Sequence, residues 1–330
     1  MMSAPGRGLA TSSPGAPSRG WSVASLLMTV LAITLLATTP AMAHRDVPLA
    51  PAHLWRTWAA DPWALLGLGA AAWAYAVGVG RVWARAGDGR GIARWRLYCY
   101  AAGILTLFIA LVSPLDPLGG TLFSAHMVQH ELLIVAAAPL LVLGLPLVAF
   151  AWALPRRWRR RVGRVVRLPQ FRASWRLLTH PLSAWTLHAA AILIWHAPTL
   201  YQSTLESSVA HSVQHLSFFG TALLFWWAIL QPNGSRRLSP GLAVIYLFTT
   251  AVYGTALGAL LTLSPVPWYP LYGDRAMLWG LSQIEDQQLG GLIMWVPFGL
   301  LYTAAALVIL GRWLHHMNRR EVGSPVLTPR

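Results

Sequence analysis

The chain has 330 residues, of which 56% are hydrophobic and only 11% are charged, and its formal net charge is +15. Soluble domains carry about 25% charged residues, so this composition excludes an ordinary soluble protein and indicates an integral membrane protein. The single cysteine, Cys99, excludes an internal disulfide and a paired-cysteine metal site, so a bound metal must use nitrogen, oxygen or thioether ligands.

The N-terminal element is an apolar stretch, WSVASLLMTVLAITLLA, which follows a segment rich in Ser, Pro and Gly. Residues 41–43 (AMA) have the pattern of a signal-peptidase site. Residues 1–43 are therefore predicted to be a signal peptide or, if they are not cleaved, a signal anchor. Both forms place residues 44–62 outside the cytoplasm as an external N-terminal segment.

Apolar segments recur along the rest of the chain, and each is long enough to cross a hydrocarbon core of about 30 Å. The sequence predicts an all-α fold, a polytopic integral membrane helical bundle at residues 63–312, followed by a cytoplasmic tail at 313–330. The third span is long enough to contain a kink at Pro139 or Pro146. About seven transmembrane helices are expected, at residues 63–80, 96–113, 122–152, 181–197, 210–231, 241–263 and 288–311.

Arginines concentrate in alternate connecting segments, most of all in residues 156–176. Loop arginines stay on the cytoplasmic side of a membrane. The pattern therefore predicts a mature N-terminus outside and a C-terminus in the cytoplasm. Because residues 156–176 lie next to the membrane, we interpret them as a contact for anionic lipid rather than for nucleic acid.

Two copies of one pattern, HMVQH at residues 126–130 and HSVQH at residues 211–215, begin the third and fifth predicted spans. Histidines at positions i and i+4 share one helix face, so each copy offers two imidazoles to one metal ion. His196 ends the span between them, and the predicted topology places all five histidines at one depth near the outer face. His188 lies about 12 Å deeper, and we interpret it as a hydrogen-bonded core residue.

The last predicted span begins with a polar cluster, EDQQLGG, that contains Asp286. A carboxylate at a helix N-terminus is favoured by the helix dipole, so Asp286 either caps this span or completes or orients the histidine site. Gln129 and Gln214 lie beside the second histidine of each pair and are predicted to fix imidazole tautomers.

Signatures of common enzymes are missing from the sequence. The segment HELLI has Ile134 where a zinc-protease motif requires a second histidine, and we predict no enzymatic activity and no catalytic residue. Imidazole-rich sites suit copper and zinc. The residues by themselves leave three functions open: a metal-handling protein, a membrane redox protein that binds haem or quinone, and a copper transporter.

Three segments together resemble the CtaG-like assembly factors of caa3-type cytochrome c oxidase: SPLDPLGGTLFSAHMVQHELLIVAAAPLLVLGLP, IWHAPTLYQSTLESSVAHSVQHLSFFGTALLFWW and EDQQLGGLIMW. The resemblance covers most of residues 60–312. It implies an assembly factor in the plasma (inner) membrane of a bacterium that binds copper at the outer face and delivers it to the oxidase. Zinc is the other metal that these ligands suit. The implied partners are haem–copper oxidase subunits and membrane lipids but no nucleic acid, and a homodimer stays open. The implied metal ligands are His126, His130, His196, His211, His215 and Asp286.

Overall fold

The computed structural model describes residues 48–59, 61–230 and 238–322, so the predicted signal segment lies outside the described residues. These described residues form helices and no strand, which confirms the predicted all-α class. The elements are, in chain order, η1 (Pro51–Arg56), α2 (Pro62–Ala86), α3 (Arg94–Leu111), α4 (Leu115–Gly119), α5 (Phe123–Glu131), η2 (Leu132–Ala137), α6 (Ala138–Leu143), α7 (Pro146–Ala153), α8 (Arg156–Val165), α9 (Pro169–Leu178), α10 (Pro181–Trp195), α11 (Pro198–Glu206), α12 (Ser208–Leu230), α13 (Pro240–Leu263), η3 (Pro270–Trp279) and α14 (Gln283–Val322).

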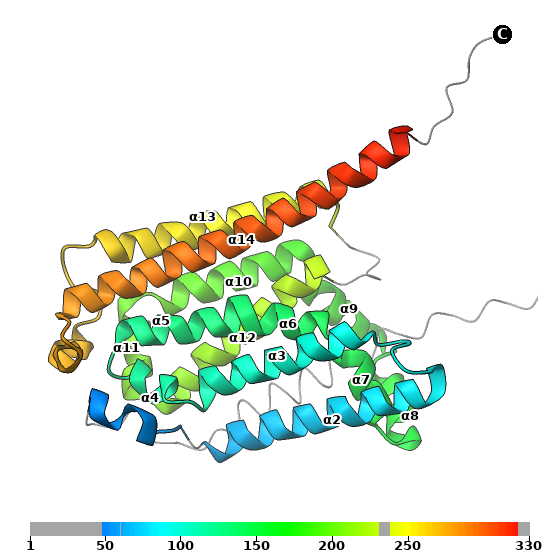
Figure 1. Ribbon diagram of the computed structural model, residues 1–330, viewed down its shortest axis with the longest axis horizontal. Coiled ribbons are helices and arrows are strands. Elements are labelled where there is room, and N and C mark those ends of the chain that lie inside the picture. Colours follow the sequence, from blue (N-terminus) through cyan, green and yellow to red (C-terminus); the bar gives the residue numbers. More distant parts are fainter. Residues whose placement is uncertain (1–47, 60, 231–237, 323–330) are drawn as a thin grey trace, which may run out of the picture.

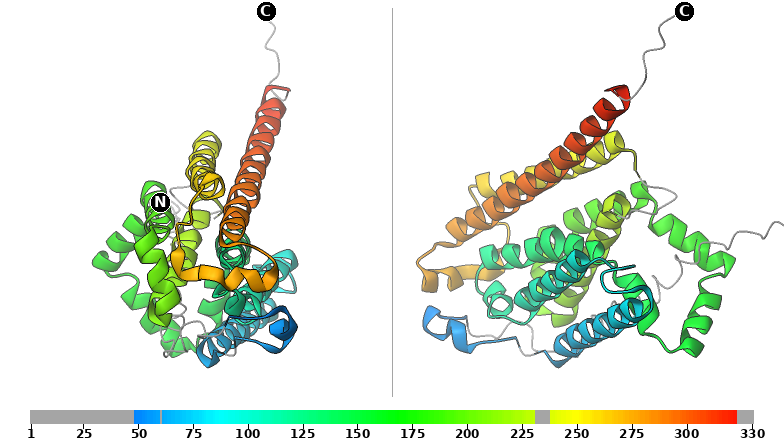
Figure 2. Two further views of the ribbon diagram at one scale, coloured as in Figure 1. Left: turned by 90° about the vertical axis from the view of Figure 1, so that its left-hand side faces the viewer. Right: turned by 45° about the vertical axis from the view of Figure 1, so that its right-hand side comes forward.

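The long helices lie side by side in a bundle, and short helices gather at its two ends (Figure 1). One end holds η1, α4, α11 and η3. The other end holds α8 and α9, which carry the arginine-rich segment 156–176. The last helix, α14, runs beside α13 in every view and continues past it (Figures 1 and 2). The two ends of the bundle therefore differ in composition.

Five helical segments among the described residues are long and apolar enough to cross a membrane, which supports the predicted membrane class. A sixth is present if α9 and α10, which meet at an angle of 61°, form one broken span. The predicted count of seven is thus not confirmed within the described part of the chain. The predicted span at 96–113 corresponds to α3, which begins with Arg94 and Arg96. The five segments are Pro62–Ala86, Phe123–Leu143, Ser208–Leu230, Pro240–Leu263 and Gln283–His315.

The third predicted span is irregular at two places. Its backbone hydrogen bonding becomes π-helical over Leu132–Ala137, just before Pro139. Proline has no N–H, so a carbonyl one turn earlier loses its helical partner, and a local change in winding accommodates this loss. The helical segment then ends before Leu145, whose φ of 52° is left-handed. Pro146 follows directly and is the first residue of α7. Both prolines that were candidates for a kink therefore lie beside an irregularity.

Glycines let α14 approach its neighbours closely. A Cβ on Gly258 of α13 would lie 2.8 Å from the carbonyl oxygen of Gly291 on α14. A Cβ on Gly290 would overlap the Phe123 ring at the start of α5. Small residues at helix contacts are typical of membrane proteins, where van der Waals packing drives association. This packing brings the first turn of α14 against the first turn of α5.

Candidate metal centre

Asp286, in the first turn of α14, holds the first turn of α5 in place. Its Oδ2 accepts a hydrogen bond from Phe123 N at 2.6 Å, and its Oδ1 accepts from Ser124 N at 3.1 Å and from Ser124 Oγ. Leu122, the N-cap of α5, supplies no side-chain acceptor. A carboxylate from another helix therefore satisfies two amides that a helix start leaves unpaired. The charge also lies at the positive end of the α5 dipole. Asp286 thus positions the turn that carries His126.

Five imidazole rings meet between α5, α12 and the end of α10. His126 and His130 lie one turn apart on α5, with ring centroids 4.4 Å apart, and His211 and His215 on α12 are 4.0 Å apart. The ring of His126 lies 5.1 Å from that of His211, and the ring of His130 lies 5.4 Å from that of His215. His196 lies 6.1 Å from His130. The structure therefore brings together the five histidines that the sequence singled out, and their role as metal ligands stays a prediction.

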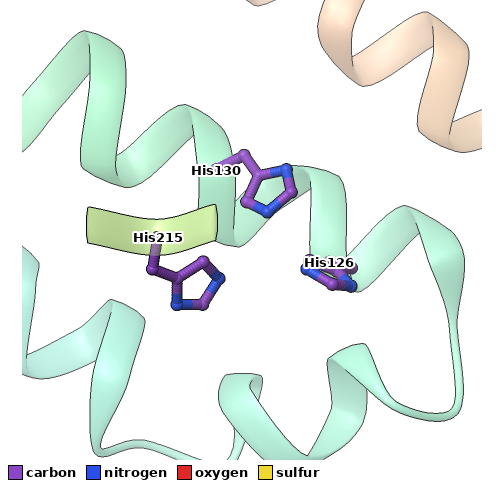
Figure 3. A group of neighbouring side chains, drawn as sticks. All are labelled: His126, His130 and His215. Atoms are coloured by element: carbon purple, nitrogen blue, oxygen red, sulfur yellow. The ribbon is translucent and has the colours of Figure 1, made fainter. Parts of the chain in front are cut away.

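Three of these histidines form a compact set of potential ligands. His126 and His130 project from one helix toward His215 on another (Figure 3). One ring nitrogen from each lies within 4.8 Å of the others, and all three residues are buried. Two nitrogens on one tetrahedral zinc ion lie about 3.3 Å apart, so this set is close enough to surround one ion with at most a small movement of the rings.

The ring of His130 is the most unusual polar group in the cluster. Both its Nδ1 and its Nε2 are buried, and neither has a hydrogen-bond partner among the described residues. In the neighbouring His196, Nδ1 lies 2.7 Å from the carbonyl oxygen of Ile192, and only an N–H can bond to that acceptor. The lone pair of His196 is therefore on Nε2, which is also buried without a partner in the described part of the chain. Each residue therefore has a buried ring nitrogen that accepts no hydrogen bond from the described residues.

A chain of two tyrosines sets the tautomer of His126. The Tyr272 hydroxyl donates to the carbonyl oxygen of Gly119 at 3.0 Å, which leaves its own oxygen to accept from the Tyr201 hydroxyl at 2.9 Å. The Tyr201 oxygen then accepts from Nδ1–H of His126 at 2.9 Å. Burial raises the pKa of both phenols well above the usual value, so they stay protonated and keep donating. This order of donors places the lone pair of His126 on Nε2, as a metal ligand requires.

The tyrosine chain predicts unequal effects for its two members. In Tyr272→Phe, the Tyr201 hydroxyl loses its acceptor and turns to donate to Nδ1 of His126, which moves the ring proton to Nε2. We expect copper affinity to fall about 10-fold. In Tyr201→Phe, Nδ1–H of His126 can still donate to the Tyr272 oxygen, 3.3 Å away, so the loss should be smaller.

Copper titrations of the two purified variants measure this difference. The matched control is Tyr246→Phe, because the buried Tyr246 hydroxyl on α13 has no hydrogen-bond partner among the described residues. Equal affinities for Tyr272→Phe and Tyr246→Phe would show that the chain does not set the tautomer.

The other residues that the sequence singled out lie outside the ligand set. Both carboxylate oxygens of Asp286 accept hydrogen bonds from the start of α5 and not from the start of its own helix. Of its predicted roles, the contacts therefore favour orientation of the site over capping of α14. Gln129 Nε2 donates to the Ala110 carbonyl oxygen and to Asp116 Oδ1, both at 2.7 Å, and not to an imidazole. His188 is buried and its Nδ1 lies 3.1 Å from Thr221 Oγ1, as expected for a core histidine.

Sequence reasoning missed Asp116, Tyr201 and Tyr272. All three come from short helices at one end of the bundle. The sequence offers one weak signal, since Asp116 is a carboxylate in an otherwise apolar segment, SPLDPLGG. Nothing in the spacing of the tyrosines connects them with His126.

This fold and this cluster define a helical membrane protein with histidines gathered between its helices. Residues 73–316 match the family model described as cytochrome c oxidase caa3 assembly factor (Caa3_CtaG). Because the match covers more than half of the chain, the protein belongs to this family. The resemblance in the quoted motifs is thereby confirmed.

The chain is also similar to longer mycobacterial proteins. It is 28% identical over 235 residues to uncharacterized proteins of Mycobacterium bovis and Mycobacterium tuberculosis, which covers 68% of this chain and 35% of each relative. A protein of Mycobacterium leprae is 25% identical over 239 residues, which covers 69% of this chain and 35% of that relative. The chain thus spans about a third of the length of these relatives. No solved structure matches it significantly.

Proposed function

We propose that this protein is a non-enzymatic membrane assembly factor that takes up copper through its histidine cluster and passes it to a caa3-type haem–copper oxidase. Membership of the caa3 assembly factor family supports the assembly role. The compact set of His126, His130 and His215 supports metal binding. Copper is the cargo in this proposal, and zinc is the other ion that three imidazoles suit.

The burial of His130 carries the proposal. A buried polar atom without a partner costs roughly 1–3 kcal/mol, and both ring nitrogens of His130 are in that state among the described residues. A metal ion bound to one nitrogen removes half of this cost. The rings of His126, His196 and His215 surround His130 at centroid distances of 4.4 to 6.1 Å, so they supply the remaining ligands.

The origin of the ligands on separate helices suits delivery of an ion. One ring nitrogen each of His126, His130 and His215 lies within 4.8 Å of the others, and these histidines come from α5 and α12. A small relative movement of the two helices would open the set and release the ion. His211 lies beside this set, because its ring is 5.1 Å from that of His126. Asp286 serves as a positioning residue because it holds the first turn of α5.

The position of the cluster supports uptake at the outer face of the plasma membrane. The histidines lie toward the end of the bundle that holds α4, α11 and η3, because Tyr201 of α11 and Tyr272 of η3 contact His126 (Figure 1). The arginine-rich α8 and α9 lie at the opposite end. Since arginine-rich segments stay in the cytoplasm, this arrangement supports a position of the cluster at the outer face.

Complementation of a bacterial strain that lacks the protein tests the proposal. We expect the wild type and the control His188→Ala to restore caa3 oxidase with its full copper content, because His188 lies apart from the cluster. His130→Ala should leave the oxidase deficient in copper, and added copper should partly restore it. Full restoration by His130→Ala in low-copper medium would reject the cluster as the delivery site.

A further inference from the structure

Asp116 places a carboxylate beside the histidine cluster. It lies on α4, and its Oδ1 accepts a hydrogen bond from Gln129 Nε2 at 2.7 Å, which fixes the carboxylate next to α5. One oxygen of Asp116 and one ring nitrogen each of His211 and His215 lie within 4.8 Å of one another. A carboxylate with two imidazoles is a ligand set that suits divalent copper or zinc.

This second set differs from the first in its exposure. His126, His130 and His215 are all buried, whereas Asp116 and His211 are partly exposed. The two sets share His215, and the rings of His211 and His126 are 5.1 Å apart. An ion held by Asp116 and His211 would thus lie directly beside the buried set and nearer to the solvent.

We propose that Asp116, His211 and His215 form an outer metal position through which a divalent ion reaches the buried position of His126, His130 and His215. The inference rests on the proposed copper uptake and adds a route to it. His215 stays bound while Asp116 and His211 are replaced by His126 and His130, so the ion is never released during the transfer. The step is an exchange of ligands without electron transfer. Because His215 serves both positions, one chain holds one ion at a time.

The rate of copper loading separates the two positions. In Asp116→Asn, the amide oxygen can still accept from Gln129, so the fold is retained while the anionic ligand is lost. We expect the rate of Cu(II) loading of the purified full chain to fall at least 10-fold, whereas the equilibrium affinity changes less than about 3-fold. The control is Glu206→Gln, which removes an exposed charge on α11 at the same end of the bundle. It should load at the wild-type rate.

Electron paramagnetic resonance of Cu(II) provides a second readout. His130→Ala removes the buried position and should retain a weakly bound ion with two nitrogen ligands. Adding Asp116→Asn to His130→Ala should abolish that signal. An unchanged loading rate in Asp116→Asn, equal losses of rate and affinity, or a signal that survives in the double variant would each overturn the outer position. A wild-type protein that binds no copper would instead overturn the proposed function itself.

Discussion

Replacing His130 with alanine is expected to lower the affinity of the purified protein for copper more than about 100-fold. Loss of a residue that hydrogen-bonds to a metal ligand lowers affinity about 10–100-fold, and loss of the ligand itself should have a larger effect. The variant removes the ring at the centre of the cluster, which lies 4.4 Å from His126 and 5.4 Å from His215. It also removes two buried nitrogens that have no partner in the described part of the chain. The apoprotein should therefore lose little stability.

Competition titration with a chelator of known copper affinity measures this effect, and thermal unfolding of the apoprotein measures stability. The matched control is His188→Ala, since His188 is also a buried histidine within the bundle but bonds to Thr221 instead of facing the cluster. We expect His188→Ala to lose some stability and retain its copper affinity. Equal copper affinities in the two variants would contradict the assignment of His130 as a ligand.

Asp286→Ala is expected to give the largest loss of stability, about 3 kcal/mol. The carboxylate is 1% exposed and accepts from two backbone amides and one hydroxyl at the start of α5. Hydrogen bonds to charged groups contribute about 1.5–3 kcal/mol each, and the amides would be left unsatisfied in the interior. Because the freed turn precedes His126, copper affinity should fall as well.

Unfolding of the metal-free protein in detergent, followed by circular dichroism, isolates the effect on stability from any stabilisation by bound metal. Asp286→Asn keeps one oxygen acceptor and should lose less than Asp286→Ala. The control Asp274→Ala removes an exposed carboxylate of η3 and should leave the midpoint unchanged. If Asp286→Ala unfolds at the same midpoint as Asp274→Ala, the carboxylate does not hold α5.

Local patterns in the chain predicted much of the candidate site. The i, i+4 spacing of His126 with His130, and of His211 with His215, fixes each pair on one helix face whatever the helix packs against. Alternating arginine-rich segments then placed these pairs and His196 at one end of the bundle. The five rings lie together in the structure, although their function as ligands awaits the measurements described above.

Helix boundaries were predicted less well, because hydropathy reports the environment of a segment and not its hydrogen bonding. The predicted span at 122–152 is one apolar stretch, yet it divides at Leu145 and changes its winding before Pro139. The predicted span at 181–197 is a 15-residue helix that meets α9 at a sharp bend. The prolines predicted a kink in the first of these spans, whereas the apolar content of the sequence shows neither feature.

The sequence by itself determined that this protein is a helical membrane protein with two matched histidine pairs, since composition sets the environment and helical periodicity sets the pairs. Only the tertiary structure decided which partners reach them: Asp116 beside His211 and His215, the two tyrosines on His126, and Asp286 on α5. Tyr201 lies 75 residues from His126 along the chain, and Asp286 lies 163 residues from Phe123. They depend on how the helices rotate and approach one another, which side-chain packing fixes and which no local spacing records.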